Sequence, residues 1–438
     1  MKELRVGMLG FGTVARGVAS LLRQNGRVIA ERCGIELRLT RISTRNPNKT
    51  AAMNLDGIAV DADVDALVED PTIDCVVELI GGLDPAERLV TTALNRGKHV
   101  VTANKALIAE RGMALFSVAH SNNKDLCFEA SVAGAVPIVK AIRESLAANR
   151  IESIHGVLNG TCNYILTEMR ERKLSFAQTL AEAQEKGYAE ADPSFDIDGI
   201  DTAHKLAILA AIAWSMPPDF GGIHIEGIRH ITDSDIAWAN EMGYRIKLLA
   251  IAKHRPEGLE LRVQPTLVPL GTMVSQVEGV FNAIFVRGDH AGITMYHGRG
   301  AGEHPTASAV VADLMDLGRN LRAGLSSTRV PPLSVANDHL HPIPIHGMDH
   351  LECEYYLRLA ILDRPGVLAE ITAILARHGI SIDAIHQKGG ATLSEAVSLV
   401  IVTHQCREMD LQTSLAVLEG LETVRGKPVV IRMESGLN

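Results

Sequence analysis

The stretch VGMLGFGTVARGV, Val6–Val18, decides how the N-terminal part of this chain is expected to fold. An apolar run is followed by Gly10, Gly12 and Ala15 in the spacing GxGxxA, and then by a helix-like pattern. The first glycine permits a tight turn, the second lets a pyrophosphate approach the backbone, and the small third residue lets the helix pack closely on the strand. The unpaired amide groups of the helix N-terminus then favour phosphate. The stretch therefore predicts a strand, a dinucleotide-binding turn and a helix.

The pattern that begins there continues to about residue 128. Apolar runs alternate with segments of helical periodicity, and the runs are RVGMLG (5–10), CVVELIGG (75–82), KHVVTA (98–103) and DLCFEA (125–130). Strands that alternate with helices predict a parallel sheet with helices on its faces. We therefore expect an α/β fold in which residues 1–130 form a Rossmann-like, doubly wound domain, completed by a helix that returns near residues 305–325.

Two further regions follow. Residues 131–325 combine helical segments at 175–186 and 202–214 with strand-like stretches, which predicts an α+β domain. Residues 326–350 are rich in Pro and His and have the composition of an exposed linker. Residues 351–438 alternate as strand, helix, strand, strand, helix, strand, which predicts a small ferredoxin-like βαββαβ module that binds a ligand or pairs.

The composition narrows the class of protein. The chain has 438 residues, of which 46% are hydrophobic and 22% charged, and its net charge is −9. An acidic chain lacks the basic face that nucleic acid or an anionic membrane requires, so neither is expected as a partner. The longest apolar run, Leu206–Trp214, is too short to span a bilayer, and the six scattered cysteines indicate thiols of a reducing compartment. We expect a cytoplasmic protein.

The ends of two predicted strands carry further candidates. An acidic residue at the end of the second strand would favour NAD, but here GIELRLTRISTRN ends in Ser43, Thr44 and Arg45. With no carboxylate to repel a 2′-phosphate, NADP is acceptable as the cofactor. The alternative is that Arg45, like Arg41, is an ordinary surface charge. Lys105, just past the strand KHVVTA, would point into the cofactor crevice, although lysines are more often solvated.

A second stretch, GYAEADPSFDIDGIDTAHKL (Gly187–Leu206), gathers five carboxylates before its first positive charge at Lys205. It is no EF-hand loop, because Lys205 stands where the bidentate Glu would be required. Asp201 and Lys205 are four residues apart, which places both on one face of a helix with the acid nearer the N-terminus. The pair is either a weak surface salt bridge or, because the following helix is almost wholly apolar, an ion pair that lines a cleft. In the second case Lys205 is a candidate proton donor.

These motifs resemble the homoserine dehydrogenases that have a C-terminal ACT domain. The resemblance covers essentially the whole chain, in GFGTVARGV, VELIGG, VTANKALIA, EASVAGAVPIV, LNGTCNYIL, GYAEADPSFDIDGIDTAHKL, GRGAGEHPTASAVVADL and LRLAILDRPGVLAEI. Most members have Gly where Ala15 stands, which leaves the GxGxxA fingerprint usable. The resemblance implies NAD(P)H-dependent interconversion of L-aspartate 4-semialdehyde and L-homoserine, in threonine, methionine and isoleucine biosynthesis, with residues 131–325 as the catalytic and dimerisation domain.

The resemblance also implies roles for individual residues. Lys205 would be the catalytic acid and base, Asp201 would hold it in place, and Lys105 would lie near the nicotinamide and the substrate. Glu190 would receive the amino group of the substrate, and Asp196 would be a second acid of the substrate site.

Ligands other than the substrate are implied as well. The cofactor, NADP or NAD, would be bound by Gly10, Phe11, Gly12, Thr13, Val14, Arg45, Gly81, Thr102 and Lys105. A monovalent cation, usually sodium in the family, would be bound by Glu129, Val132, Gly134 and Val136, which could supply carbonyl oxygens and one carboxylate. Asp192 and Asp198 carry no such implication, and we expect them to be turn or capping residues.

The C-terminal motifs RPGVLAEI and ISIDAIHQ resemble the ACT module, which binds amino acids at paired interfaces. The resemblance implies feedback inhibition by L-threonine in a homodimer or homotetramer, and a purely structural ACT tail is the alternative. Two other functions stay open. One is a catalytically inactive amino-acid or nucleotide sensor, which predicts damage at Lys105, Lys205, Asp201 or Glu190, although all four are present. The other is a dehydrogenase for another small amino-acid aldehyde.

Overall fold

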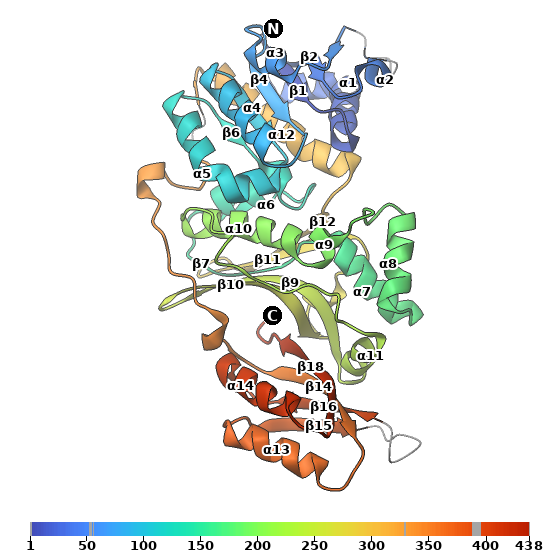
Figure 1. The fold of residues 1–438 in the computed structure, drawn as a ribbon. Helices are drawn as coiled ribbons and strands as arrows, with labels where there is room; N and C mark the ends of the chain where they lie inside the picture. The colour runs from blue at the N-terminus through green and yellow to red at the C-terminus, as the bar shows by residue number, and fades with distance from the viewer. Residues whose placement is uncertain (1, 52–54, 56, 328–329, 388–395, 438) are drawn as a thin grey trace.

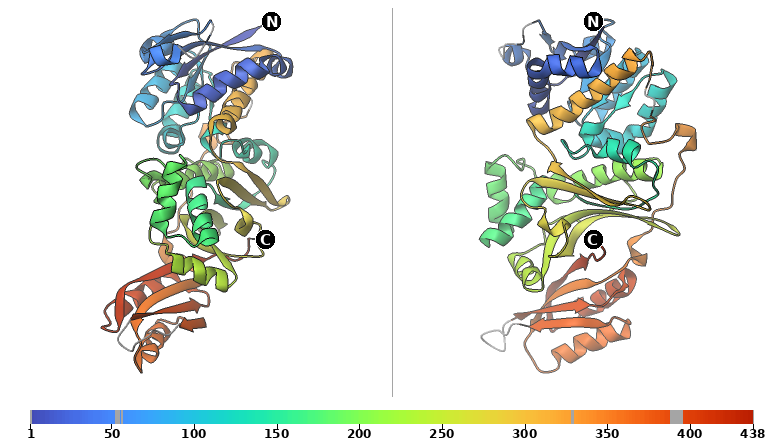
Figure 2. Two further views of the ribbon diagram at one scale, coloured as in Figure 1. Left: turned by 90° about the vertical axis from the view of Figure 1, so that its right-hand side faces the viewer. Right: turned by 180° about the vertical axis from the view of Figure 1, so that it is seen from behind.

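The computed structural model describes residues 2–51, 55, 57–327, 330–387 and 396–437. Three regions are stacked along one long axis, with the N-terminal region at one end, a large sheet in the middle and the C-terminal region at the other end (Figure 1). Figure 2 shows the same elongated arrangement from the side and from behind. In the part of the chain described, no helix has the length and apolar character needed to cross a membrane.

The N-terminal region is a parallel sheet with strand order β3-β2-β1-β4-β5-β6. Its strands are β1 (Glu3–Leu9), β2 (Glu36–Ser43), β3 (Ala59–Asp61), β4 (Cys75–Glu78), β5 (His99–Thr102) and β6 (Leu126–Cys127). Its helices include α1 (Thr13–Cys33), α2 (Pro47–Ala51), α3 (Val64–Glu69), α4 (Asp84–Asn95) and α5 (Lys105–Ser121). The strand order reverses between β1 and β4, and ligands of open α/β sheets bind at such a point, beyond the carboxyl ends of the strands. The predicted Rossmann-like fold is confirmed.

The central strands of this sheet are apolar because helices cover both faces. Val6, Val76 and Val100 are completely buried, as expected for inner parallel strands. The helix α12 (Glu303–Arg322) comes from much later in the chain and packs against α1. At Gly17 of α1 an added Cβ would lie only 2.4 Å from the carbonyl oxygen of Glu303. The close packing of α1 on α12 therefore depends on a glycine at position 17.

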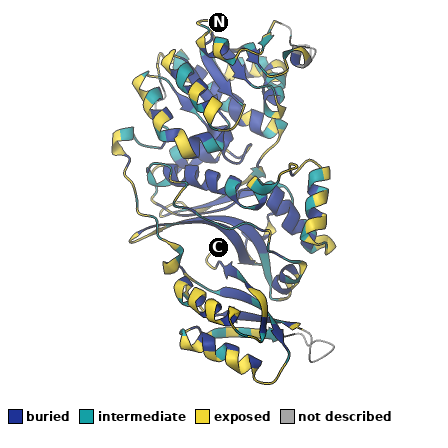
Figure 3. Cartoon of the chain, viewed as in Figure 1, coloured by how far each residue is buried: buried dark blue, intermediate teal, exposed yellow. Residues whose placement is uncertain are grey.

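The central region is a mainly antiparallel sheet, with strand order β12-β11-β7-β9-β10. Its strands are β7 (Ile151–Val157), β9 (Tyr244–Arg255), β10 (Gly258–Pro269), β11 (Phe281–Gly288) and β12 (Gly292–Arg299), with the short β8 (His224–Ile225) beside β10. Its helices include α6 (Ile138–Lys140), α7 (Gly160–Arg172), α8 (Phe176–Glu185), α9 (Ser194–Ile197), α10 (Ile200–Trp214) and α11 (Asp233–Glu241). Every residue of α10 from Asp201 to Ile212 is buried, and Figure 3 shows this helix almost entirely dark blue. The expected α+β region is present.

The C-terminal region has the predicted ferredoxin-like order. Its elements are β14 (Tyr355–Leu362), α13 (Val367–Arg377), β15 (Ile382–Gln387), β16 (Ala396–Thr403), α14 (Glu408–Glu419) and β18 (Val424–Met433), with a small ribbon of β13 (Glu352–Cys353) and β17 (Cys406–Arg407). The sheet order is β18-β14-β16-β15. The sequence did not predict that β18 also pairs in parallel with β10, through Thr266 with Arg432 and Leu267 with Met433. One continuous sheet therefore joins the central and C-terminal regions.

The segment before the C-terminal region is less exposed than its composition predicted. Leu333 and Leu340 are buried, and Ile345 forms a parallel bridge with Leu259 of β10. Prolines prevent a long α-helix here, and the segment instead contains the short 3-10 helices Asn337–His339 and Met348–His350. Isolated apolar residues remain free to pack, and backbone groups remain free to pair. The expectation of an exposed linker is therefore wrong for these residues. Residues 328–329 of the predicted linker and 388–395 of the C-terminal region lie outside the described residues.

Candidate active site

Two lysines from different helices meet on one buried carboxylate. Lys205 Nζ lies 2.8 Å from Asp201 Oδ2, and Lys105 Nζ lies 2.9 Å from Asp201 Oδ1. The predicted pair four residues apart on α10 thus exists, and it is a buried pair rather than a surface salt bridge, because only 10% of the Lys205 side chain and 6% of the Asp201 side chain are exposed. Lys205 Nζ also donates to the carbonyl oxygen of Leu158, at 2.6 Å.

Local structure brings these side chains to the carboxyl edge of the N-terminal sheet. After β5 ends, Asn104 caps the N-terminus of α5 by accepting a hydrogen bond from the backbone N–H of Leu107 at 3.1 Å, as short polar residues commonly do. Lys105 is the first residue of α5 and thus lies just beyond a strand end. Its ammonium group lies 5.2 Å from the ring centroid of Phe195, within the range of a cation–π contact.

The charges of this cluster determine its protonation. Burial alone would raise the pKa of Asp201, but the charges of Lys205 and Lys105 and their hydrogen bonds hold it well below its usual range. Burial alone would lower the pKa of Lys105, but the charge of Asp201 outweighs it and the pKa is raised. At neutral pH the cluster therefore contains an ionised carboxylate and a protonated Lys105.

The acids expected in the substrate site are placed differently from one another. Asp196 is close to the cluster, and its oxygens accept hydrogen bonds from Asn159 Nδ2 at 2.8 Å and from Thr161 Oγ1 at 3.1 Å. Burial and the nearby charge of Asp201 raise the pKa of Asp196. Glu190 is exposed, and its charge contributes to the raised pKa of Lys105. The charges of both acids thus help to raise the pKa of Lys105.

The two acids that we expected to have local roles behave in different ways. Asp192 Oδ1 accepts a hydrogen bond from the backbone N–H of Ser194 at 3.1 Å, which is a turn contact. Asp198 is the C-cap residue of α9, as expected, and its side chain also forms a two-pronged ion pair with Arg229 at the surface. Neither acid contacts a lysine of the cluster in the described residues.

The dinucleotide-binding turn has the geometry that a pyrophosphate needs. Gly10 has a positive φ of 89° and Gly12 has open space where a Cβ would be, so a ligand could approach the backbone. Gly12 caps α1 without a side-chain hydrogen bond, which leaves the first amide groups of the helix available. Thr13 begins α1, whereas Phe11 and Val14 pack partly buried against the core. These residues fit a nicotinamide dinucleotide.

The two arginines near the end of β2 have different roles. Arg41 is bound to Asp61 at 2.8 Å and to Asp70 at 3.2 Å, so it is a structural ion-pair residue. Arg45 is exposed just after the strand end. Of the two arginines, Arg45 therefore stays the candidate for a contact with a 2′-phosphate.

A buried carboxylate that the sequence analysis did not single out orders the loop at the strand ends. Glu78 is completely buried at the end of β4 and accepts hydrogen bonds from the backbone N–H groups of Ile80 and Gly81 at 2.9 and 3.0 Å. Its other oxygen accepts from Thr102 Oγ1 at 2.6 Å, and Thr102 accepts in turn from the N–H of Asn104. Glu78 therefore connects the loop after β4 to the start of α5. The sequence could have indicated the importance of Glu78, because it is a single acid inside the apolar run CVVELIGG.

The segment expected to bind a cation has oxygen atoms suited to one. The Glu129 carboxylate is buried and accepts backbone N–H groups of Val139 and Lys140, at 3.1 and 2.9 Å. Burial and the charge of Asp313 raise the pKa of Glu129 to about 7, so a nearby cation would stabilise its charged form. Among the hydrogen bonds of the described residues, none uses the carbonyl oxygen of Val132 or Gly134.

The backbone of this segment turns sharply. Ala133 and Gly134 both have positive φ, of 54° and 50°, and a Cβ on Gly134 would lie 2.7 Å from the carbonyl oxygen of Gly300. Val136 N donates back to the carbonyl oxygen of Ala133 at 2.9 Å. The Glu129 carboxylate and the carbonyl oxygens of Val132 and Gly134 fit a hard monovalent cation, whereas the carbonyl oxygen of Val136 already accepts the backbone N–H of Ile138 at 2.8 Å. The described residues contain no cluster of three or more His, Cys, Asp or Glu side chains that could hold a metal ion.

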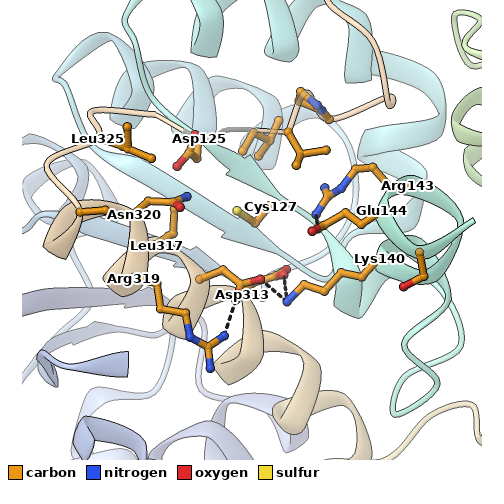
Figure 4. A pocket seen from close by; sticks show the side chains of 16 residues that line it. Asp125, Cys127, Lys140, Arg143, Glu144, Asp313, Leu317, Arg319, Asn320 and Leu325 are labelled. Carbon is orange, nitrogen blue, oxygen red and sulfur yellow. Dashed lines mark hydrogen bonds and ion pairs between the residues drawn. The ribbon is translucent and has the colours of Figure 1, made fainter. Parts of the chain in front are cut away.

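A cavity of about 700 Å³ lies near Glu129 rather than at the two lysines (Figure 4). Inside it Lys140 pairs with Asp316 at 2.5 Å and lies 3.6 Å from Asp313. Asp313 also accepts the backbone N–H of Glu129 at 2.9 Å. These charges compensate one another, and the hydrogen bond from Glu129 to Asp313 links the loop that carries Glu129 to α12.

The fold and the site together define a nicotinamide-dependent oxidoreductase: a dinucleotide-binding turn at the point where strand order reverses, and ammonium groups at the same edge of the sheet. Comparison with protein families then gives the family. Residues 137–315 match the family described as homoserine dehydrogenase, residues 10–129 match the homoserine dehydrogenase NAD binding domain, and residues 355–423 match the ACT domain.

Individual proteins that are similar to this chain are also homoserine dehydrogenases. A homoserine dehydrogenase of Pseudomonas aeruginosa is 46% identical over 434 residues, which are 99% of each chain. The crystal structure of a homoserine dehydrogenase from Thiobacillus denitrificans is similar with a TM-score of 0.94 and 48% identity, over 100% of this chain and 99% of that one. A hyperthermophilic archaeal homoserine dehydrogenase in complex with NADPH is similar with a TM-score of 0.62 and 29% identity, over 73% of this chain and 98% of that one. The chain belongs to the homoserine dehydrogenase family, whose members are NAD(P)-dependent oxidoreductases, and it carries a C-terminal ACT domain.

Proposed function

We propose that the cluster of Lys105, Asp201 and Lys205 is the catalytic centre for reduction of L-aspartate 4-semialdehyde to L-homoserine. The observation that carries this proposal is the single buried carboxylate shared by two ammonium groups. An ammonium has three N–H donors, and Lys205 directs two of them to Asp201 and Leu158. The third remains for the substrate carbonyl oxygen.

The bound reduced nicotinamide supplies the hydride to the aldehyde carbon. As negative charge develops on the carbonyl oxygen, Lys205 stabilises it and donates a proton, and Asp201 keeps the ammonium in position. Lys105, which is 30% exposed, faces the same space from the cofactor side. We propose that Asp196 and Glu190 bind the α-ammonium group of the substrate, because two carboxylates are the natural partners for that cation.

One assay tests this function. The loss of NADPH absorbance is followed with L-aspartate 4-semialdehyde, and L-threonine is added in a parallel series. We expect turnover that threonine lowers. A chain that binds threonine but shows no turnover would instead be an amino-acid sensor, and a chain that prefers another small amino-acid aldehyde would have a different substrate.

We propose that NADP is accepted as the cofactor and that Arg45 contacts its 2′-phosphate. Replacing Arg45 with Ala is expected to raise the KM for NADPH about 10-fold, which corresponds to one charge-assisted hydrogen bond, and to leave the KM for NADH unchanged. Steady-state kinetics with both cofactors measure this ratio. Arg27→Ala, which removes an exposed arginine of α1 paired with Glu31, is the control. Equal changes for NADPH and NADH would contradict the proposal.

We propose that the segment of Glu129, Val132, Gly134 and Val136 binds sodium or another monovalent cation. Replacing all alkali cations with tetramethylammonium at constant ionic strength is expected to lower the rate. Glu129→Gln is expected to weaken activation by NaCl about 10-fold, because the carboxylate charge is lost. The rate is measured against NaCl concentration, with Glu152→Gln, an exposed acid of β7, as control. A rate independent of NaCl in the wild type would contradict the cation site.

We propose that the ACT domain binds L-threonine, that the chain is a homodimer or homotetramer, and that the enzyme serves threonine, methionine and isoleucine biosynthesis. Two contacts between the C-terminal and central regions support regulation: the β10–β18 pairing, and Asp235 of α11, which accepts Arg358 Nε at 2.6 Å and the Tyr356 hydroxyl at 3.0 Å.

We also propose that the chain is divided into residues 1–130, 131–325, 326–350 and 351–438.

A further inference from the structure

Asn159 lies between two acids of the site, the buried Asp201 and the half-buried Asp196. It follows β7 and caps the N-terminus of α7, where its Oδ1 accepts the backbone N–H of Cys162 at 2.8 Å. Its Nδ2 donates to Asp196 Oδ1 and to Asp201 Oδ2, both at 2.8 Å. Only 4% of the residue is exposed. An amide nitrogen carries two protons, so both are committed to the acids.

The chemistry of the site favours an amide at this position. Two carboxylates at close range repel each other, and unpartnered buried oxygens are costly. A lysine or arginine would satisfy them but would compete with Lys205 and Lys105 for the charge of Asp201. A serine or threonine has only one proton to donate. Asparagine supplies two donors and a cap acceptor without a charge.

The same short segment also holds the catalytic lysine. Asp201 Oδ2 receives hydrogen bonds from both Asn159 Nδ2 and Lys205 Nζ, each at 2.8 Å. Leu158, the residue before Asn159, accepts the other hydrogen bond of Lys205 Nζ through its carbonyl oxygen, at 2.6 Å. Residues 158–159 thus contact the lysine, its partner acid and the acid proposed for the substrate.

We propose that Asn159 is a positioning residue that fixes the spacing between the proton-donating pair, Lys205 and Asp201, and the substrate-binding acid Asp196. This inference rests on the proposed function, since it assumes the roles given there to the three residues. We expect Asn159 to affect both kcat and the KM for the substrate. It contacts Asp201, which holds Lys205, and Asp196, which is proposed to bind the substrate.

The substitution Asn159→Asp separates this role from helix capping. Asp caps a helix as well as Asn does, but it loses both donors and adds a third carboxylate. We expect kcat to fall about 100-fold, as for a small misplacement of reacting groups, the KM for aspartate semialdehyde to rise, and the KM for NADPH to stay unchanged. Asn159→Ser, which keeps a cap acceptor and one donor without adding charge, is expected to show the same pattern with a smaller loss. This second variant decides the question if Asn159→Asp does not fold.

Two further variants make the outcome specific. Ser175→Ala removes the capping box of α8, an exposed helix away from the lysines, and is expected to lower Tm with kcat and KM unchanged. A change in Tm alone in both Asn159 variants, with wild-type kcat and KM, would overturn the inference. Lys205→Ala is measured in parallel: if it retains turnover, the proposed catalytic centre is wrong, whereas an inactive Lys205→Ala with fully active Asn159 variants refutes only the role of Asn159.

Discussion

Lys205→Ala is expected to lower kcat by about 10³-fold, which is within the range for loss of a general acid, while the dissociation constant for NADPH stays near the wild-type value. The side chain is 10% exposed and is held by Asp201 and by the carbonyl oxygen of Leu158. In the variant, a water molecule bound by the same two groups would be uncharged. The negative charge that develops on the substrate oxygen would therefore lose its positively charged partner. The rate is measured from NADPH absorbance, and cofactor binding from fluorescence titration.

Lys186→Ala is a suitable control for this experiment. Lys186 is the exposed C-cap residue just after α8 and donates to the Tyr164 hydroxyl at 2.7 Å. Its removal should leave kcat unchanged. Wild-type kcat in Lys205→Ala would show that this ammonium is not the proton donor. A loss of NADPH affinity as large as the loss of kcat would show that Lys205 serves the cofactor rather than the chemistry.

Local spacing was sufficient to predict two of the three residues in the cluster of Lys105, Asp201 and Lys205. Asp201 and Lys205 are neighbours on any helix because residues four apart share a face, and the apolar sequence after Lys205 correctly indicated burial. The other partner of Asp201, Lys105, begins a helix of the N-terminal region. Its distance of 2.9 Å from Asp201 depends on how that region packs on α10. No periodicity in the sequence contains this information. The resemblance to a family implied only that Lys105 lies near the nicotinamide and the substrate, so its contact with Asp201 was not predicted.

The fold shows the same difference between local patterns, which the sequence predicts, and contacts between distant segments, which it does not. Alternating strands and helices predicted both α/β patterns because each element has its own period. The pairing of β18 with β10 involves only two residue pairs between distant strands and leaves no local signal. Arg41 was indistinguishable from Arg45 in the sequence, and only the positions of Asp61 and Asp70 show that Arg41 is already bound.

Asp201→Asn is expected to damage both stability and catalysis. The substitution keeps the size of the side chain but leaves two ammonium groups with no shared carboxylate, and breaking a buried ion pair in this way costs about 3 kcal/mol of unfolding free energy. The pKa of Lys105 should fall, because burial would remain while the raising effect of Asp201 is lost. We therefore expect kcat to fall about 100-fold and the alkaline limb of the pH–rate profile to move to lower pH. Asp198→Asn, which affects an exposed acid of the same stretch, is the control, with an expected loss below about 1 kcal/mol.

The effect of Asp201→Asn on the unfolding free energy should depend on pH. Because the pKa of Asp201 is lowered in the folded protein, its stabilising effect is complete above the ordinary carboxyl pKa of about 3.9 and is lost as the pH falls from there through the lowered pKa. The difference in unfolding free energy between wild type and Asp201→Asn should thus be constant between about pH 5 and 7 and shrink below about pH 4. Urea unfolding at several pH values measures it. A difference that grows as the pH falls would mean that Asp201 is protonated in the folded protein, and the two ammonium groups would then lack the counter-charge on which the proposed catalysis depends.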